Sequence, residues 1–194
     1  DSVEKLKGWN LFGSQQLDGK INYGFDFQKL DGSRYFIVGT QHSLYRYDSS
    51  LHQFIKLNTC DYPYAKDFRW QSAVLNDKLY LVNGAAPIQV FVDSSTPIAN
   101  LVGDAAMPTT ARYIINFVNH LLVGVPTEGG VTSLQRVRWS ELDNPNVWQR
   151  TISNEADFID MGEDGDTIQN MKLLGPDRTI VYKESGIYAL TYVG

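Results

Sequence analysis

Apolar residues in this chain come in short runs separated by turn-forming residues, a pattern typical of β-strands. One order recurs four times: an apolar strand, a tight turn, a four-residue apolar strand, a short loop and an alternating strand. Asn, Asp and Gly accept the left-handed backbone of tight hairpin turns, so their place between the first two strands predicts hairpins. The predicted turns are Asp31-Gly32, Asn76-Asp77, Asn119-His120 and Pro176-Asp177.

The second strand of each unit ends at a nearly regular spacing. Gly39, Gly84 and Gly124 are 45 and 40 residues apart, and Lys183 takes this place in the fourth unit, 59 residues on. Such a period, with four strands per unit, predicts an all-β fold: a β-propeller or part of one, built from repeated four-stranded antiparallel meanders. A β-sandwich with similar hairpins is the alternative. Propellers have roughly four to eight blades, so four units make a small complete ring or a fragment of a larger one.

The repeats define the domain organisation. Residues 1–20 form a polar N-terminal segment with Trp9 and Phe12 as anchors, and residues 21–194 hold about four blades. The second strands are apolar at consecutive positions, which predicts burial on both faces. We expect four of their residues to occupy equivalent buried positions: Val38, Leu81, Val123 and Val181.

Residues 140–165 lengthen the spacing between the third and fourth units, which predicts an insertion that projects outward and contacts a neighbouring chain. Ser140 is placed to cap a single helical turn that Pro145 ends. Trp139 completes a strand and should lie in the core, whereas Trp148 should face the partner. Trp and Arg are enriched at protein interfaces, which suits this interpretation.

Composition and charge narrow the function. The 194 residues are 43% hydrophobic and 20% charged, as in a folded globular protein, and Tyr, Phe and Trp favour strands. The net charge of −5 gives no sequence-wide basic footprint for nucleic acid. A single cysteine, Cys60, excludes an intramolecular disulfide. No apolar run approaches the length of a membrane anchor, and the start at Asp1 suggests a processed product or an excerpt.

The densest acidic stretch resembles the start of a calcium loop. It fails at two ligand positions, where Gly162 and Met171 stand, so we predict a solvated loop and neither a metal nor a cofactor. Its members are Glu155, Asp157, Asp160, Glu163, Asp164 and Asp166.

Catalytic motifs are also weak. The three histidines, His42, His52 and His120, lie outside any nucleophile elbow, and Cys60 has no adjacent basic residue. His120 occupies the hairpin-turn position that Asp77 occupies in the second unit, so a role in the turn is enough to explain its presence. The two carboxylates of a glycosidase come together only in the folded protein, so the sequence cannot reveal such a pair. The remaining residues favour a protein that is not an enzyme.

Arg136 and Arg138 alternate with apolar residues, so both guanidinium groups should project from one strand face. They suit phosphate, carboxylate or a neighbouring subunit, although an exposed strand face with ordinary charges is the favoured explanation. The predicted interface residues are Trp148, Arg136, Arg138, Asp160, Glu163 and Asp164.

The last third of the chain carries a more specific pattern. Between Arg138 and Trp148 a strand leads into the motif Trp-Ser-x-Leu-x-x-Pro-x-x-Trp. An acidic loop and the residues Asp166 to Ile168 follow. The pattern ends in a hairpin of the type Lys-Glu-Ser-x-Ile-Tyr between Val181 and Tyr188. This pattern resembles the β-propeller tail and neck proteins of short-tailed bacteriophages, the tubular tail nozzle and DNA-stabilisation hub proteins. The first two units match only in general propeller pattern.

The resemblance implies a ring-forming structural component of the virion, without catalytic activity, around the DNA exit channel. Its implied partners are an adaptor, a tail fibre and further copies, with DNA passing through without specific binding. Such a protein resides in the virion tail, and in the host cytoplasm during assembly. The alternative is a cellular propeller that binds a protein or carbohydrate ligand, including a glycoside-active enzyme.

Overall fold

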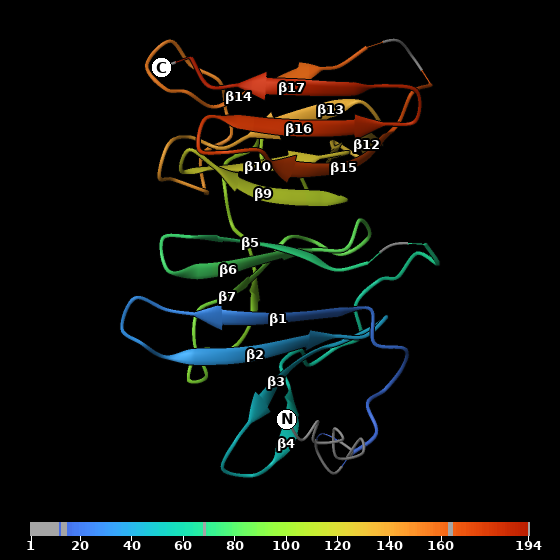
Figure 1. Cartoon of the computed structure of the whole chain (residues 1–194), viewed down its shortest axis with the longest axis vertical. Helices are drawn as coiled ribbons and strands as arrows, with labels where there is room; N and C mark the ends of the chain where they lie inside the picture. Colours follow the sequence, from blue (N-terminus) through green and yellow to red (C-terminus); the bar gives the residue numbers. More distant parts are fainter. Residues whose placement is uncertain (1–11, 13–14, 68, 163–164, 194) are drawn as a thin grey trace, which may run out of the picture.

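A computed structural model describes residues 12, 15–67, 69–162 and 165–193. The described residues contain strands and turns but no helix, so the all-β prediction is confirmed. Of the four larger antiparallel sheets, the first lies at one end of the long axis, the second lies in the middle, and the third and fourth lie together at the other end (Figure 1). None of these residues belongs to a helix long and apolar enough to cross a membrane.

The first two sheets are four-stranded meanders in which the strand order follows the chain. The first sheet holds β1 (Tyr23–Gln28), β2 (Arg34–Gly39), β3 (Leu44–Asp48) and β4 (Gln53–Lys56). The second sheet holds β5 (Gln71–Leu75), β6 (Lys78–Val82), β7 (Gln89–Phe91) and β8 (Ala99–Asn100).

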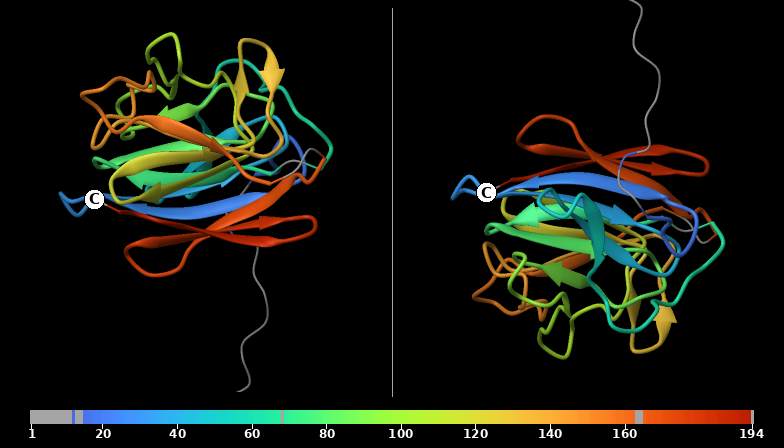
Figure 2. Two further views of the ribbon diagram at one scale, coloured as in Figure 1. Left: turned by 90° about the horizontal axis from the view of Figure 1, so that it is seen from above. Right: turned by 90° about the horizontal axis from the view of Figure 1, so that it is seen from below.

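The third sheet is also four-stranded, and the fourth has three strands. The third holds β9 (Tyr113–Phe117), β10 (His120–Gly124), β13 (Arg136–Trp139) and β14 (Asp157–Asp160), and the fourth holds β15 (Ile168–Leu173), β16 (Arg178–Lys183) and β17 (Ile187–Thr191). A small hairpin, β11 (Thr127–Glu128) and β12 (Val131–Thr132), projects on the side away from β16 and β17 (Figure 2).

Part of the predicted insertion, residues 140–165, belongs to the third sheet. Residues 157–160 form β14, which pairs with β13 as the outermost strand of the third sheet. The excursion proper runs from Ser140 to Ala156, and it contains turns in place of the predicted helical turn. Ser140 does not cap a helix; its Oγ accepts a hydrogen bond from the backbone N–H of Leu121 at 3.0 Å.

Hairpin turns join the first two strands of each sheet. Asn76 and Asp77 have φ of 50° and 59°, as a two-residue turn requires. Asp31-Gly32 and Pro176-Asp177 also lie in these connections. The prediction was one residue wrong in the third sheet: the turn is Val118-Asn119, with φ of 49° and 58°, and His120 begins β10. Local turn preference misled here, because a β-branched residue rarely adopts positive φ.

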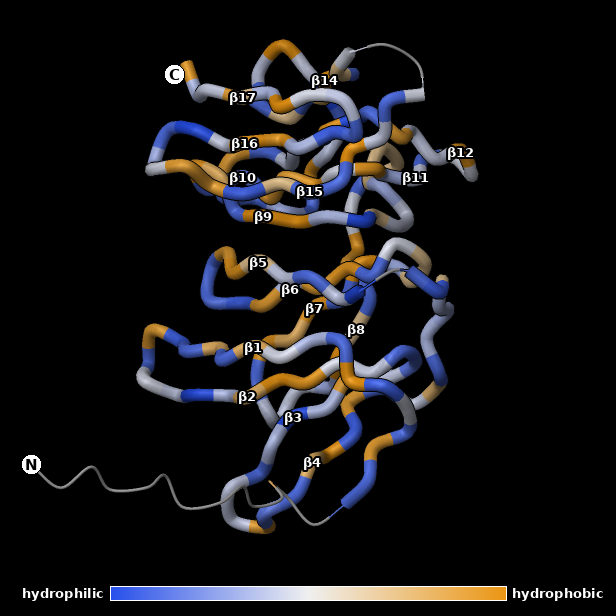
Figure 3. The backbone as a smooth tube through the Cα atoms, turned by 45° about the vertical axis from the view of Figure 1, so that its right-hand side comes forward, coloured by the Kyte–Doolittle hydropathy of each residue, from blue (hydrophilic) through white to orange (hydrophobic). Residues whose placement is uncertain are grey.

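Apolar residues fall mainly on the strands and polar residues on the connections (Figure 3). Three clusters fill the spaces between successive sheets, and each draws side chains from both neighbours. Leu81 lies in the cluster against the first sheet, Val123 in the one against the second, and Val181 in the one against the third. Val38 lies on the corresponding face of the first sheet, so the four predicted positions are equivalent and buried.

The glycines that end the second strands allow neighbouring sheets to approach. A Cβ on Gly39 would lie 2.6 Å from Cδ1 of Trp70, which precedes the second sheet. A Cβ on Gly124 would lie 3.1 Å from the sulfur of Met171, in the fourth sheet. In the first and third sheets this glycine therefore reflects contact between sheets as well as the end of a strand, whereas Gly84 lies beyond β6 with a φ of 81°.

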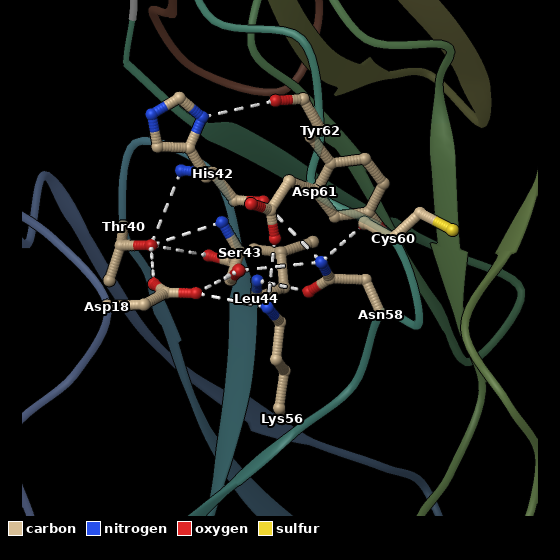
Figure 4. A network of polar contacts seen from close by, with 10 residues as sticks. All are labelled: Asp18, Thr40, His42, Ser43, Leu44, Lys56, Asn58, Cys60, Asp61 and Tyr62. Carbon is tan, nitrogen blue, oxygen red and sulfur yellow. Dashed lines mark hydrogen bonds and ion pairs between the residues drawn. The ribbon is translucent and has the colours of Figure 1, made fainter.

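The described part of the N-terminal segment packs on the first sheet. The Phe12 ring lies 4.5 Å from that of Tyr47, as its predicted role as an anchor requires, while Trp9 is outside the described residues. Asp18 accepts hydrogen bonds from Thr40 Oγ1 at 2.8 Å, Ser43 Oγ at 2.5 Å and Lys56 Nζ at 3.1 Å (Figure 4). Partial burial opposes ionisation, but these donors outweigh it and hold the pKa of the Asp18 carboxyl well below its usual range.

Candidate functional site

The two predicted interface arginines lie side by side on β13 and share one acidic partner. Nη1 of Arg136 is 2.8 Å from Oε2 of Glu128, and Nη1 of Arg138 is 2.6 Å from Oε1 of the same carboxylate. Both guanidinium groups also lie over the ring of Phe158, at 3.9 and 5.7 Å from its centroid. Both therefore project from one strand face, as the alternation predicts.

This face does not leave both charges free for a partner. Arg138 is buried and donates to the carbonyl of Trp148 at 2.6 Å, so its placement in an exposed interface was wrong. Arg136 forms a two-pronged pair with Asp160, with both N–O distances at 2.7 Å. These hydrogen bonds hold the pKa of Asp160 below its usual range. Of the predicted interface residues that the structure describes, Arg136 and Asp160 keep solvent exposure, with 21% and 49% of their side chains exposed.

Trp148 occupies the opposite of its predicted position. Its side chain is 0% exposed, and it belongs to the cluster between the second and third sheets. The indole N–H donates to the Pro145 carbonyl at 2.8 Å, and the backbone N–H donates to Asp104 at 2.8 Å. The excursion folds back at Pro145 because burying the ring removes a large apolar area from water. Glu163 and Asp164, the remaining predicted interface residues, lie outside the described residues.

A different surface feature joins the third and fourth sheets. A cleft of about 640 Å³ opens between the ends of β9, β10 and β13 on one side and the end of β17 on the other. Phe117, Leu122, Trp139 and Leu190 supply its apolar wall. Its polar groups come mainly from the excursion and from residue 192: Arg150, Thr151, Asn154, Glu155, Asp157 and Tyr192.

Three titratable side chains meet in the lining of this cleft. Nε2 of the buried His120 lies 3.1 Å from Oε2 of Glu155, and the Tyr192 hydroxyl donates to the same oxygen at 3.2 Å. Nδ1 of His120 lies 2.8 Å from the Ser140 carbonyl, which only accepts, so Nδ1 carries a proton. The negative charge beside it raises the pKa of the Tyr192 hydroxyl.

The other polar groups of the cleft also have partners within the chain. The Thr151 hydroxyl lies 3.3 Å from the Ser153 hydroxyl, and the second carboxylate, Asp157, is 3.2 Å from Arg150. Within the ranges that the structure describes, no three His, Cys, Asp or Glu side chains are arranged to hold a metal ion. An aromatic wall with hydrogen-bonding groups at one end suits binding of a ligand that is partly apolar and partly polar.

Sequence reasoning did not find this cleft. The sequence places His120 at a predicted turn and Glu155 in the acidic stretch, and no motif singles out Tyr192. These residues are 35 and 37 positions apart along the chain. No local pattern links them, because only the packing of the fourth sheet on the third brings them together.

Comparison with known proteins gives a fold and no family. No family model matches the chain. No curated protein matches its sequence. Among solved structures, the computationally designed Ika4 protein matches with a TM-score of 0.56 and 8% identity, over 95% of this chain and 99% of that one.

The N-terminal domain of Nup159 matches with a TM-score of 0.53 and 10% identity, over 90% of this chain. The match spans only 45% of that structure. At such identities the likeness shows a shared all-β arrangement and carries no information on function.

Proposed function

We propose that the chain is an arc of a β-propeller that serves as a ring-forming structural component of a bacteriophage tail or neck, around the DNA exit channel and without catalytic activity. Support for the propeller comes from four successive sheets, of which the last three place their first strands, β5, β9 and β15, next to one another. Sheets joined along their first strands radiate from a common side, as blades do. Support for the phage location comes from the pattern between Arg138 and Tyr188.

The observation that carries the structural role is that the series of sheets is open at both ends. Among the described residues, the first sheet shares an apolar cluster with the second sheet and the fourth shares one with the third, so each has one face without a neighbouring sheet. These two sheets lie towards opposite ends of the molecule (Figure 1). A ring closes only when these two faces acquire partners. In an assembled ring, further sheets of the same protein or of a neighbouring one cover these faces.

The charge suits a channel for DNA. A net charge of −5 repels the phosphate backbone, so DNA passes through the lumen without adhering. In this role the adaptor above and the tail fibre beside the ring are the other partners. The protein then resides in the virion tail, after assembly in the host cytoplasm.

The genomic neighbourhood tests this function directly. We expect the coding region to lie beside genes for a portal and an adaptor, and the protein to appear in the proteome of purified virions. Neighbouring genes of cellular metabolism, together with absence from purified virions, would reject the proposal.

The cleft supports a second candidate, a cellular propeller that binds a carbohydrate or protein ligand. Trp139 offers part of an aromatic face, and Asn154 and Glu155 offer hydrogen-bonding groups beside it. Titration with a panel of oligosaccharides, followed by tryptophan fluorescence, tests this role. A saturable signal that is lost in Trp139→Ala and kept in Ile152→Ala, a change at a fully exposed loop position, favours it. No response to any sugar favours the structural role.

A further inference from the structure

A pocket of about 680 Å³, separate from the cleft, lies at one end of the first sheet. Antiparallel pairing gathers chain segments at this end. Tyr23, the first residue of β1, pairs with Gly39, the last residue of β2, and Gly39 pairs with Leu44, the first residue of β3. The residues before β1 and the loop from β2 to β3 are therefore neighbours. The connection from β4 to β5 passes beside them and completes the lining (Figure 1).

This pocket has an excess of positive charge. Lys20 comes from the segment before β1, and Lys66 and Arg69 come from the connection to β5. All three residues are exposed. Asp67 is the one acidic residue among the described lining residues, so two positive charges are in excess. The chain as a whole carries a net charge of −5, which makes a cationic pocket an exception on its surface.

Among the residues that the structure describes, these three cations have no ion-pair partner. The carboxylate of Asp18, two positions before Lys20, is already paired with Lys56 at 3.1 Å and so does not neutralise them. A concave surface lined by one sign of charge focuses the electrostatic field and concentrates counter-ions. The unpaired cations therefore favour an anion from outside the chain.

Fixed contacts hold the connection that carries two of these cations. The Tyr64 hydroxyl donates to the backbone carbonyl of Lys66 at 2.6 Å. The indole N–H of the buried Trp70, next to Arg69, donates to the Thr40 carbonyl at 2.9 Å. One contact shapes the turn before the cations, and the other ties the connection to the end of β2. A backbone that is already ordered loses less entropy when a ligand binds.

We propose that this pocket binds the phosphate group of a small molecule. A phosphate monoester carries nearly two negative charges at neutral pH, which matches the excess positive charge of the lining. The guanidinium group of Arg69 offers a planar fork of donors for phosphate oxygens, and the two lysines add point charges. The side-chain amides of Asn22 and Gln41 supply further donors. The volume lies within the range of roughly 300–1,000 Å³ that is typical of small-molecule sites. This inference goes beyond the proposed structural role and does not rest on it.

The DNA backbone offers the same phosphate chemistry from a different source. A duplex presents a long line of phosphates and is bound by basic groups spread along an extended surface. Here the cations line one concave site on an acidic chain, an arrangement that suits a small ligand better than a duplex. The site is therefore assigned to a small phosphate compound, and DNA binding is a separate outcome of the test.

Pyrophosphate is the probe, titrated into the protein by calorimetry at constant ionic strength and neutral pH. The test variant combines Lys20→Gln with Arg69→Gln. Its matched control combines Lys172→Gln with Arg178→Gln, which removes the same charges at exposed positions of the fourth sheet. Tricarballylate, a carboxylate anion, and a short DNA duplex are titrated in the same way. Circular dichroism checks folding, and Lys66→Gln alone replaces the test variant if that variant does not fold.

We expect one saturable site for pyrophosphate in the unchanged protein and in the control. The test variant should bind at least about tenfold more weakly, because two charged hydrogen-bond donors are lost. Absence of a saturable signal in the unchanged protein, or an equal loss in the control and the test variant, overturns the proposal. Tricarballylate binding as tight as that of pyrophosphate overturns the assignment to phosphate, and tighter binding of DNA overturns the assignment to a small molecule. None of these results bears on virion proteomics, so failure here and failure of the phage role are distinguishable.

Discussion

Nε2 of His120 lies 3.1 Å from Oε2 of Glu155, although the two residues are 35 positions apart in the chain. The partners differ in environment: His120 is 3% exposed, whereas the Glu155 side chain is 48% exposed. Because Nδ1 already donates to Ser140, Nε2 makes a hydrogen bond with the carboxyl group only when one of the two carries an additional proton. The pair joins the start of β10 to the excursion and, through Tyr192, to the end of the fourth sheet.

Replacing the two partners should have unequal effects. His120→Ala leaves a buried cavity and an unsatisfied Ser140 carbonyl, so we expect a loss of about 2–3 kcal/mol in the free energy of unfolding. Glu155→Ala removes an exposed partner and should cost less than about 1 kcal/mol. Denaturant unfolding of both variants provides the measurement. Equal losses in the free energy of unfolding would mean that the hydrogen bond between His120 and Glu155, and not the burial of the imidazole ring, supplies the stability.

Trp148→Ala should damage the fold more than Trp139→Ala. The buried ring of Trp148 fills the space between the second and third sheets, and its truncation should cost about 3–5 kcal/mol. Trp139 is half-buried at the cleft, and its truncation should cost about 1–2 kcal/mol. Circular dichroism during thermal and denaturant unfolding measures both. A Trp148 variant as stable as the unchanged protein contradicts the core position.

The equivalent second-strand residues should respond alike to truncation. Replacing Val38, Leu81, Val123 or Val181 by Ala should each cost about 1–4 kcal/mol, because each side chain is buried. Val131→Ala is the matched control: Val131 is exposed on β12, and its truncation should cost less than about 0.5 kcal/mol. Losses below the control at most of the four sites would show that the strands between sheets are peripheral.

Acid should release the N-terminal segment through Asp18. Its pKa is lowered in the folded protein from the usual 3.8, so the folded state favours the ionised form. The stability it contributes is therefore complete above pH 3.8 and is lost as the pH falls from there towards the lowered value.

Asp18→Asn tests this contribution. The variant should lose about 1 kcal/mol at neutral pH, because the amide is a weaker acceptor for Thr40, Ser43 and Lys56. Its stability should also decline less between pH 4 and acid. Unfolding curves across this range measure both effects, and parallel declines for the two proteins would assign the acid sensitivity to other carboxylates.

Local sequence determined the strands and most of the turns. Apolar runs, alternation and Asn, Asp and Gly at the turns act over a few residues, so the hairpins at Asp31-Gly32 and Asn76-Asp77 follow from them directly. The burial of Val38, Leu81, Val123 and Val181 follows for the same reason. The third turn departs by one residue because strand register, which depends on cross-strand packing, places positive φ on Val118.

Tertiary structure alone decided where the distinctive side chains point. An aromatic ring after a proline suits an interface or a core equally well, and only the space between the second and third sheets placed Trp148 inside. Arg138 became buried because Glu128, ten residues earlier, reaches it from a separate hairpin. The cleft of His120, Glu155 and Tyr192 exists only where two sheets meet, since burial and ion pairing join residues that chain order keeps apart.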